Sequence, residues 1–386
     1  MHVPLGTPSY IRFGVMLLIA VAVAMGCATT PHEPEALQET SQQAYSVRTA
    51  HDELYVAVSP VRRSVQIVHS SVAVVGATVD AVVNDRFQRR IRETLPEYDF
   101  GAEFENAVSA SLGAHMPPNS HRVPPMGSTA GYQSRRQAQE ARFQALARDG
   151  HELVLDNRLT YGLYGPEATL VTKLESTMYA LPSGRRLFDQ TIYTRSEPVY
   201  ANMELRDPTF TYPPNLDVHN IRFAAEDDAL DAWLMDSGAP LRDAFDEAVT
   251  HSTEALLTAL ELEVTPDGAY WMGVSHLLRR RYDTARAYFE GALAGDPGHL
   301  GAANGLAVTL ARKGEHEEAI AMTESLVEEH PNFMPGWFNL AWWRARETGA
   351  YNEALEAYQR ALELDGPRNR RIERTLDRTV DVGQWR

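Results

Sequence analysis

The chain has 386 residues, a length that suggests two or three domains, each able to bury a core of its own. Its 52 acidic residues outnumber the 36 basic ones and give a net charge of −16, which would repel a phosphate backbone and argues against nucleic-acid binding. A single cysteine excludes a framework of intramolecular disulfides.

Residues 1–26 have the layout of a secretory signal peptide. Arg12 is followed by an apolar stretch over residues 13–23 and then by small residues. The stretch is too short and wrongly flanked for a permanent membrane-spanning helix. We therefore predict that this segment targets the chain and is not part of its fold.

The segment ends in Ala24-Met25-Gly26-Cys27, which resembles the lipobox of bacterial lipoproteins. The resemblance implies that cleavage leaves Cys27 as the first residue, carrying acyl chains such as palmitate that anchor it stably to a membrane. Ala28 stands where an aspartate would signal inner-membrane retention, so the resemblance implies an outer-membrane anchor facing the periplasm. An ordinary secretory signal with an incidental cysteine is the alternative.

Residues 27–50 have the composition of a lipidated tether. They contain Pro31 and Pro34, are biased toward Gln, Ser and Thr, and show no apolar period.

An α+β domain is predicted over residues 51–262, with an antiparallel meander and packed helices. Alternating apolar and polar residues predict three strands, at 152–161, 169–180 and 186–195. Residues 54–58 and 65–68 are also strand-like. Apolar residues at helical spacing predict helices at 72–95, 104–112, 141–147 and 241–260. The order of elements resembles bacterial envelope lipoproteins of the CsgG-like and TolB N-terminal types.

Three segments of this domain leave alternatives open. The proline-containing loops His115–Ser134 and Glu197–Ile221 are long enough to be functional or disordered, and Tyr200, Phe210 and Tyr212 could be interface anchors or could fold over the sheet. The apolar run Val72–Val83 favours a buried core helix over a membrane-inserting segment, because it is short of a spanning length.

The C-terminal part, residues 263–386, contains a repeat of 34 residues. Ala285, Phe289 and Pro297 recur as Ala319, Thr323 and Pro331, and a third unit carries one inserted residue near Glu347–Gly349. The pattern resembles the tetratricopeptide repeat family over roughly residues 266–367, which implies an all-α solenoid of three helix pairs. Residues 368–379, with Ile372 and Leu376 on one face, predict a capping helix.

Repeats of this family present a concave surface lined by the first helix of each pair. The residues expected to line it are Tyr270, Val274, Asn304, Val308, Arg312, Phe338, Trp342 and Arg346. Aromatic and arginine side chains are frequent binding hot spots, so we predict a groove for a protein or peptide partner. For Trp337, Trp343 and Phe289 packing between helices is the preferred interpretation.

The sequence contains no recognisable motif for catalysis, metal binding or cofactor binding. The 13 histidines are scattered, and neither paired cysteines, a phosphate loop nor a nucleophile elbow is present. The acidic clusters around Asp99 and at residues 226–228 are typical of helix starts. We predict no metal, no cofactor and no enzymatic activity.

The sequence thus favours an outer-membrane lipoprotein that scaffolds or assembles envelope proteins through its repeats and does not bind nucleic acid. The alternatives are an envelope hydrolase with the repeats as a docking arm, and a secretin pilotin or pilus assembly factor.

Overall fold

The computed structural model describes residues 32–51, 53–57, 83–127, 132–164, 168–196, 226–364, 366 and 368–379. The predicted signal peptide, Cys27, the strand-like segment 65–68, the apolar run except Val83, and the loop Glu197–Ile221 lie outside these residues.

The N-terminal part is built on one mixed sheet, with strand order β3-β1-β4-β5-β6 and β2 paired to β4 beyond the end of β1. Its strands are β1 (Gln43–Thr49), β2 (Tyr55–Ala57), β3 (Ser120–Arg122), β4 (Leu153–Tyr164), β5 (Thr169–Ala180) and β6 (Arg185–Arg195). Strands β4, β5 and β6 are antiparallel, which confirms the predicted meander, whereas β1 runs parallel to β3 and to β4.

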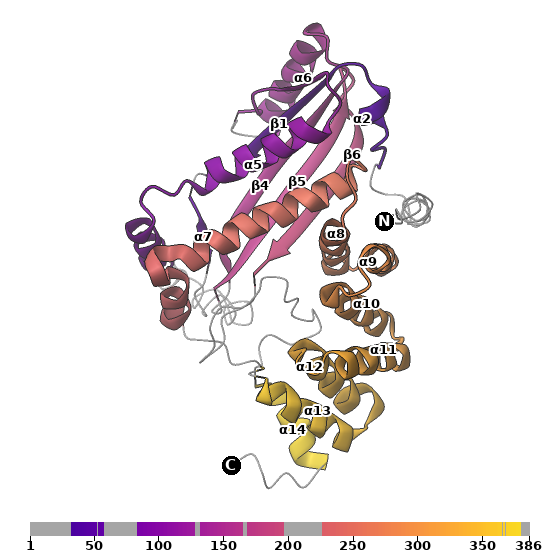
Figure 1. Ribbon diagram of the computed structural model, residues 1–386. Coiled ribbons are helices and arrows are strands. Elements are labelled where there is room, and N and C mark those ends of the chain that lie inside the picture. The colour runs from indigo at the N-terminus through magenta and orange to yellow at the C-terminus, as the bar shows by residue number, and fades with distance from the viewer. Residues whose placement is uncertain are drawn as a thin grey trace, which may run out of the picture.

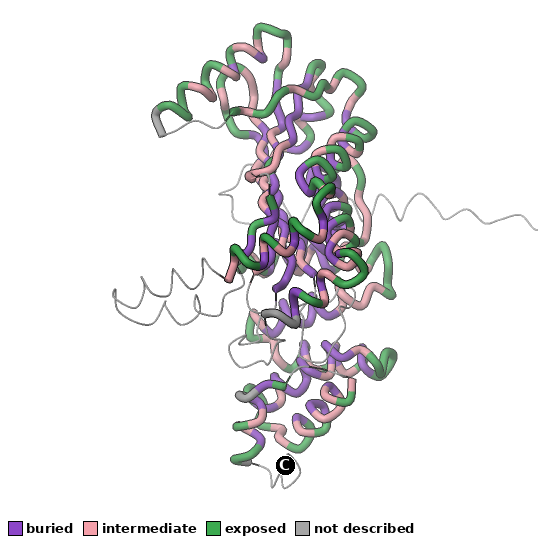
Figure 2. Tube along the Cα trace, turned by 90° about the vertical axis from the view of Figure 1, so that its left-hand side faces the viewer, coloured by how far each residue is buried: buried purple, intermediate pink, exposed green. Residues whose placement is uncertain are grey.

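Helices cover the two faces of this sheet unequally. α5 (Phe100–His115) and α7 (Glu226–Ala259) lie across one face, and α6 (Tyr132–Arg148) lies on the other, near one end of the strands (Figures 1 and 2). Under α5 and α7 the sheet contributes buried apolar residues such as Leu155, Leu174 and Phe188. Under α6 the core is small and centres on Phe143 and Val154.

The ends of the helices follow local chemistry. The Asp99 carboxylate accepts a 2.9 Å hydrogen bond from the Ala102 amide, so this acidic residue caps α5 as the sequence predicted. α7 starts at the predicted acidic cluster and is broken at Met235–Gly238, where Asp236, Ser237 and Gly238 have positive φ. Beyond the break it buries Leu241 and Phe245 against the sheet. A further helix spans residues 83–94.

The predicted tether over residues 27–50 is wrong from His32 onward. His32 forms an isolated bridge to Phe188 of β6, α2 (Ala36–Glu39) follows, and β1 lies inside the sheet. The sequence pattern did not reveal β1, because its polar residues are buried and satisfied by hydrogen bonds. The Ser46 hydroxyl donates to the Asp156 carboxylate at 2.7 Å, and the Asn157 side-chain amide donates to the Ser46 carbonyl at 3.1 Å.

The loop predicted over His115–Ser134 also holds structure, since β3 lies in it and adds an edge strand to β1. Over the described ranges, no helix combines the length and the apolar character that crossing a membrane requires.

Candidate functional site

The C-terminal part is a stack of helix pairs that starts beside β6 and runs away from the sheet (Figure 1). Its helices are α8 (Pro266–Leu278), α9 (Tyr282–Gly295), α10 (Leu300–Lys313), α11 (His316–Glu329), α12 (Met334–Trp343), η2 (Arg344–Thr348), α13 (Tyr351–Glu363) and α14 (Arg370–Thr379). α8 begins with a Thr265 hydroxyl cap on the Gly268 amide at 3.0 Å, and Pro266 occupies the first turn.

Small residues and one large ring explain the 34-residue spacing. Ala285, Ala319 and Ala354 are fully buried, which lets the second helix of each pair approach the first. The Phe289 ring fills the space between Gly273 of α8 and Gly305 of α10, where an added Cβ at either glycine would come within 2.6 Å of the ring.

The inserted residue of the third unit is absorbed by a π-helical turn. η2 follows α12 directly and ends at Gly349, whose φ is +70°. A π turn accommodates one extra residue without ending the helix. The third pair therefore keeps its packing although its spacing is one residue longer.

α14 caps the stack, as predicted. Ile372 and Leu376 are buried, and the Tyr358 hydroxyl of α13 accepts a hydrogen bond from the backbone amide of Asn369 at 2.5 Å. The same hydroxyl donates to the Glu373 carboxylate at 3.2 Å. These polar contacts fix the last helix on the end of the array.

The first repeat is attached to both the sheet and α7. The Ser275 hydroxyl of α8 accepts a 2.8 Å hydrogen bond from the Tyr193 amide of the edge strand β6. On the α7 side, a Cβ at Gly268 would come within 2.3 Å of the Thr258 hydroxyl and 2.6 Å of the Glu254 carbonyl oxygen. Such close approach holds the repeats in a fixed orientation to the sheet, and α8 covers an edge that could otherwise pair with other chains.

His276 is buried next to this junction. Its ring stacks on Tyr288 at a centroid distance of 5.3 Å. Burial, reinforced by the positive charges of Arg281 and Arg279 and by His32, lowers the pKa of His276 to about 3, so the ring is neutral at physiological pH.

Six of the eight residues predicted to line the groove are buried in this structure: Tyr270, Val274, Asn304, Val308, Phe338 and Trp342. Tyr270 packs on His299 at 4.8 Å and on Trp271 at 5.0 Å, and Phe338 packs edge-on to Tyr358 at 6.1 Å. Trp271 belongs to α8 itself, whereas His299 caps α10 and Tyr358 lies on α13, so the other two contacts join neighbouring helices of the array.

Asn304 has a partner that the sequence analysis missed. The Asn339 side-chain amide donates to the Asn304 side-chain oxygen at 2.7 Å, and both residues are buried. Their separation of 35 residues is one more than the repeat, so they occupy adjacent positions in consecutive units, and this spacing was the available signal. This pair ties α10 to α12.

The two remaining groove residues, Arg312 and Arg346, are less buried than the other six. Arg312 is partly buried, which together with Arg280 lowers its pKa despite the opposing effect of Tyr282. Arg346 is exposed, and its guanidinium carbon lies 4.9 Å from the centre of the Trp342 ring. In this conformation these two arginines are the groove residues that a partner could reach.

Trp337 and Phe338 differ from the sequence assignment in how far they are buried. Trp337, interpreted as packing, is only half-buried, and its indole NH donates to the Pro331 carbonyl at 2.9 Å. Phe338, interpreted as lining the groove, is 1% exposed. Trp343 and Phe289 are buried between helices, in agreement with the packing interpretation.

Comparison with known proteins decides what these helices are. Two tetratricopeptide repeat families match the chain, over residues 276–341 and 337–372. The helices over residues 276–372 therefore match tetratricopeptide repeats. This assignment confirms the all-α solenoid predicted to follow the α+β domain.

Other comparisons add little about function. No curated protein matches the chain. A solved structure described as the hypothetical protein CT253 from Chlamydia trachomatis is 10% identical, covers 57% of this chain and 98% of its own, and superposes with a TM-score of 0.25. Within the described part of the chain, no three His, Cys, Asp or Glu side chains are grouped so as to hold a metal ion.

Proposed function

We propose that this protein is an outer-membrane lipoprotein that faces the periplasm and binds other envelope proteins through its tetratricopeptide repeats, without catalysing a reaction. The repeats carry the proposal, because stacked repeats of this kind present extended surfaces for protein partners. The location is supported by the lipobox-like Ala24–Cys27 segment and by Cys27 being the single cysteine.

The attachment of the repeats to the sheet supports a scaffold. Ser275 and Gly268 fix α8 on β6 and α7, so a partner held by the repeats would be held at a defined position relative to the α+β domain. A rigid connection reduces the entropy that is lost when two bound proteins are brought together.

Anchoring is tested by Cys27→Ser. The variant should move from the outer-membrane fraction to the soluble periplasm, because the acyl chains have no other site of attachment. Retention of the variant in the outer membrane at high salt would contradict the lipid anchor.

Partner binding is tested at the accessible arginines. Crosslinked envelopes from cells carrying Arg312→Gln together with Arg346→Gln should yield less of each captured partner than the parent does. Arg89→Gln is the control, because Arg89 is exposed on the helix 83–94, in the α+β part of the chain. Equal recovery from all three chains would exclude this edge of the repeats as the binding surface.

A further inference from the structure

The face of the sheet that α6 leaves uncovered forms a polar trough. One hollow of about 300 Å³ is lined by β1, β4, β5 and β6, and a second of about 600 Å³ lies between α6 and the β5–β6 hairpin. Gln139, Tyr179 and Arg186 line both hollows, so the two adjoin each other. We call them together the sheet trough.

Two arginines lie opposite each other in its floor. Arg48 of β1 pairs in register with Arg158 of β4, and both line the first hollow. Like charges directly opposite on neighbouring strands destabilise a sheet. The pair therefore costs folding free energy in the unliganded protein.

Nearby carboxylates neutralise this pair only in part. The Asp156 carboxylate forms a bidentate ion pair with Arg142, whose two terminal nitrogens each donate to one carboxylate oxygen at 2.8 Å. The Glu175 carboxylate is shared: it lies 2.6 Å from the Lys173 ammonium and farther, 4.0 Å, from the Arg158 guanidinium. In and around the first hollow, five cations thus stand against three carboxylates, in a chain whose net charge is −16: Arg48, Arg142, Arg158, Lys173 and Arg186 against Asp156, Glu175 and Asp189.

Arg48 is the least compensated of these cations. It donates to the Met126 carbonyl at 2.8 Å, and it forms no ion pair with any carboxylate of the described ranges. Burial, the neighbouring Arg158 and Arg142 lower the pKa of Arg48, and Asp156 opposes them by raising it. An anion bound beside Arg48 would offset the repulsion between the Arg48 and Arg158 guanidinium groups.

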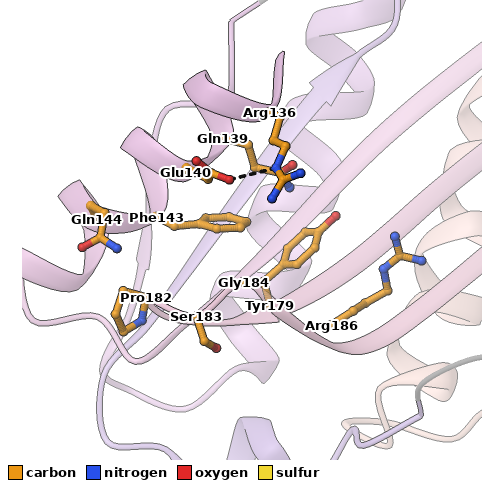
Figure 3. Close-up of a pocket in the computed structure, with 10 residues that line it drawn as sticks. All are labelled: Arg136, Gln139, Glu140, Phe143, Gln144, Tyr179, Pro182, Ser183, Gly184 and Arg186. Carbon is orange, nitrogen blue, oxygen red and sulfur yellow. Dashed lines mark hydrogen bonds and ion pairs between the residues drawn. The ribbon is translucent and has the colours of Figure 1, made fainter. Parts of the chain in front are cut away.

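The second hollow offers an apolar wall beside these charges. Phe143 and Tyr179 face each other with ring centroids 5.0 Å apart, and Gly184 of the hairpin approaches the Phe143 ring closely (Figure 3). The charged groups at its rim are paired, Arg136 with Glu140 at 3.0 Å and Arg186 with Asp189 at 2.6 Å. The uncompensated charge is therefore confined to the first hollow.

We propose that the sheet trough binds a small organic anion, with its carboxylate or phosphate group between Arg48 and Arg158 and its apolar part along Tyr179 toward Phe143. Guanidinium groups bind such oxyanions through paired hydrogen bonds. Tyr179 lines both hollows and therefore connects the charged end of the site to the apolar end.

The probes are phenylacetate and phenyl phosphate, compared with acetate, inorganic phosphate and neutral benzyl alcohol, all at one ionic strength set with chloride. Thermal unfolding of the parent should shift upward by several degrees with the aryl anions and less with the ring-free anions. Benzyl alcohol should have no effect. A larger shift with either aryl anion identifies carboxylate or phosphate as the preferred group, and titration calorimetry on the parent measures the affinity directly.

Arg158→Gln is the decisive variant, because Arg158 is about half exposed and its loss leaves no buried group unpaired. Without anion the variant should melt at or above the parent temperature, and it should bind the aryl anions at least tenfold more weakly. Tyr179→Leu should retain the response to phosphate or acetate and lose the advantage of the ring, whereas Arg89→Gln should behave as the parent does. Equal melting of the parent in aryl anions and in chloride, no heat of binding, or an undiminished response in Arg158→Gln would overturn the proposal.

Discussion

The backbone amide of Tyr193 in the edge strand β6 donates a 2.8 Å hydrogen bond to the hydroxyl of Ser275 in the first repeat helix. This bond joins the α+β domain to the repeats, and Ser275 is 1% exposed. The same hydroxyl donates to the Trp271 carbonyl within α8 at 2.7 Å. Removing the Ser275 hydroxyl oxygen alone therefore tests this attachment.

Ser275→Ala should lower the free energy of unfolding by about 1–3 kcal/mol, because the Tyr193 amide is left without its acceptor. Urea unfolding measures the change. Ser325→Ala is the matched control, since its hydroxyl lies exposed on α11 and donates to the Ala321 carbonyl at 3.3 Å. Equal effects of the two substitutions would show that the bond to β6 adds no stability.

Gly305→Ala should destabilise the repeats by about 1–3 kcal/mol, because the new methyl group would overlap the Phe289 ring. This loss exceeds the gain in helix propensity of up to about 1 kcal/mol. Combining it with Phe289→Leu should cost less than the sum of the two single changes, which a double-mutant cycle measures. Gly298→Ala, where the nearest atom lies 3.5 Å away, is the control. Additive losses would contradict the steric explanation.

Phe338→Ala should cost about 3–5 kcal/mol, because its ring is buried against Tyr358. Trp337→Ala should cost less, since that indole is only half-buried. Denaturant unfolding of both variants beside partner capture separates packing from binding. If Phe338→Ala lost partners at parental stability, Phe338 would line an open groove, as the sequence predicted.

The stability of the fold should fall on acidification through His276. Its folded pKa of about 3 lies below the unfolded value of about 6.5, so the unfolded chain takes up the proton first. The stabilisation is fully present above about pH 6.5 and is lost as pH falls toward 3, by about 1.4 kcal/mol per pH unit. His276→Leu should flatten the fall in unfolding free energy between pH 6.5 and 4.5. An unchanged slope in this variant would assign the acid sensitivity to other groups.

Local periodicity predicted the parts of the fold that repeat or alternate. The three meander strands and the repeat helices were found because their apolar residues recur at the spacing of strands and helices, as at Leu153, Leu155 and Leu159 of β4. β1 was missed because Gln43 and Ser46 are buried through hydrogen bonds to other segments, which no local pattern reveals.

The candidate sites were harder to predict, because they depend on contacts between elements. The family pattern places Tyr270 and Phe338 on the first helices but does not say how deeply neighbouring helices bury them. Arg48 and Arg158 are separated by 110 residues, and only the register of β1 with β4 brings them together.

The contact between His32 and Phe188 sets how far the protein could extend from a membrane. Only residues 28–31 separate Cys27 from His32, and five peptide steps span at most about 18 Å. If Cys27 carries the acyl chains, the corner formed by α2 and the start of β6 is held at the lipid surface. The folded protein would then stay close to the lipid surface. Its partners would have to approach the membrane to contact the repeats.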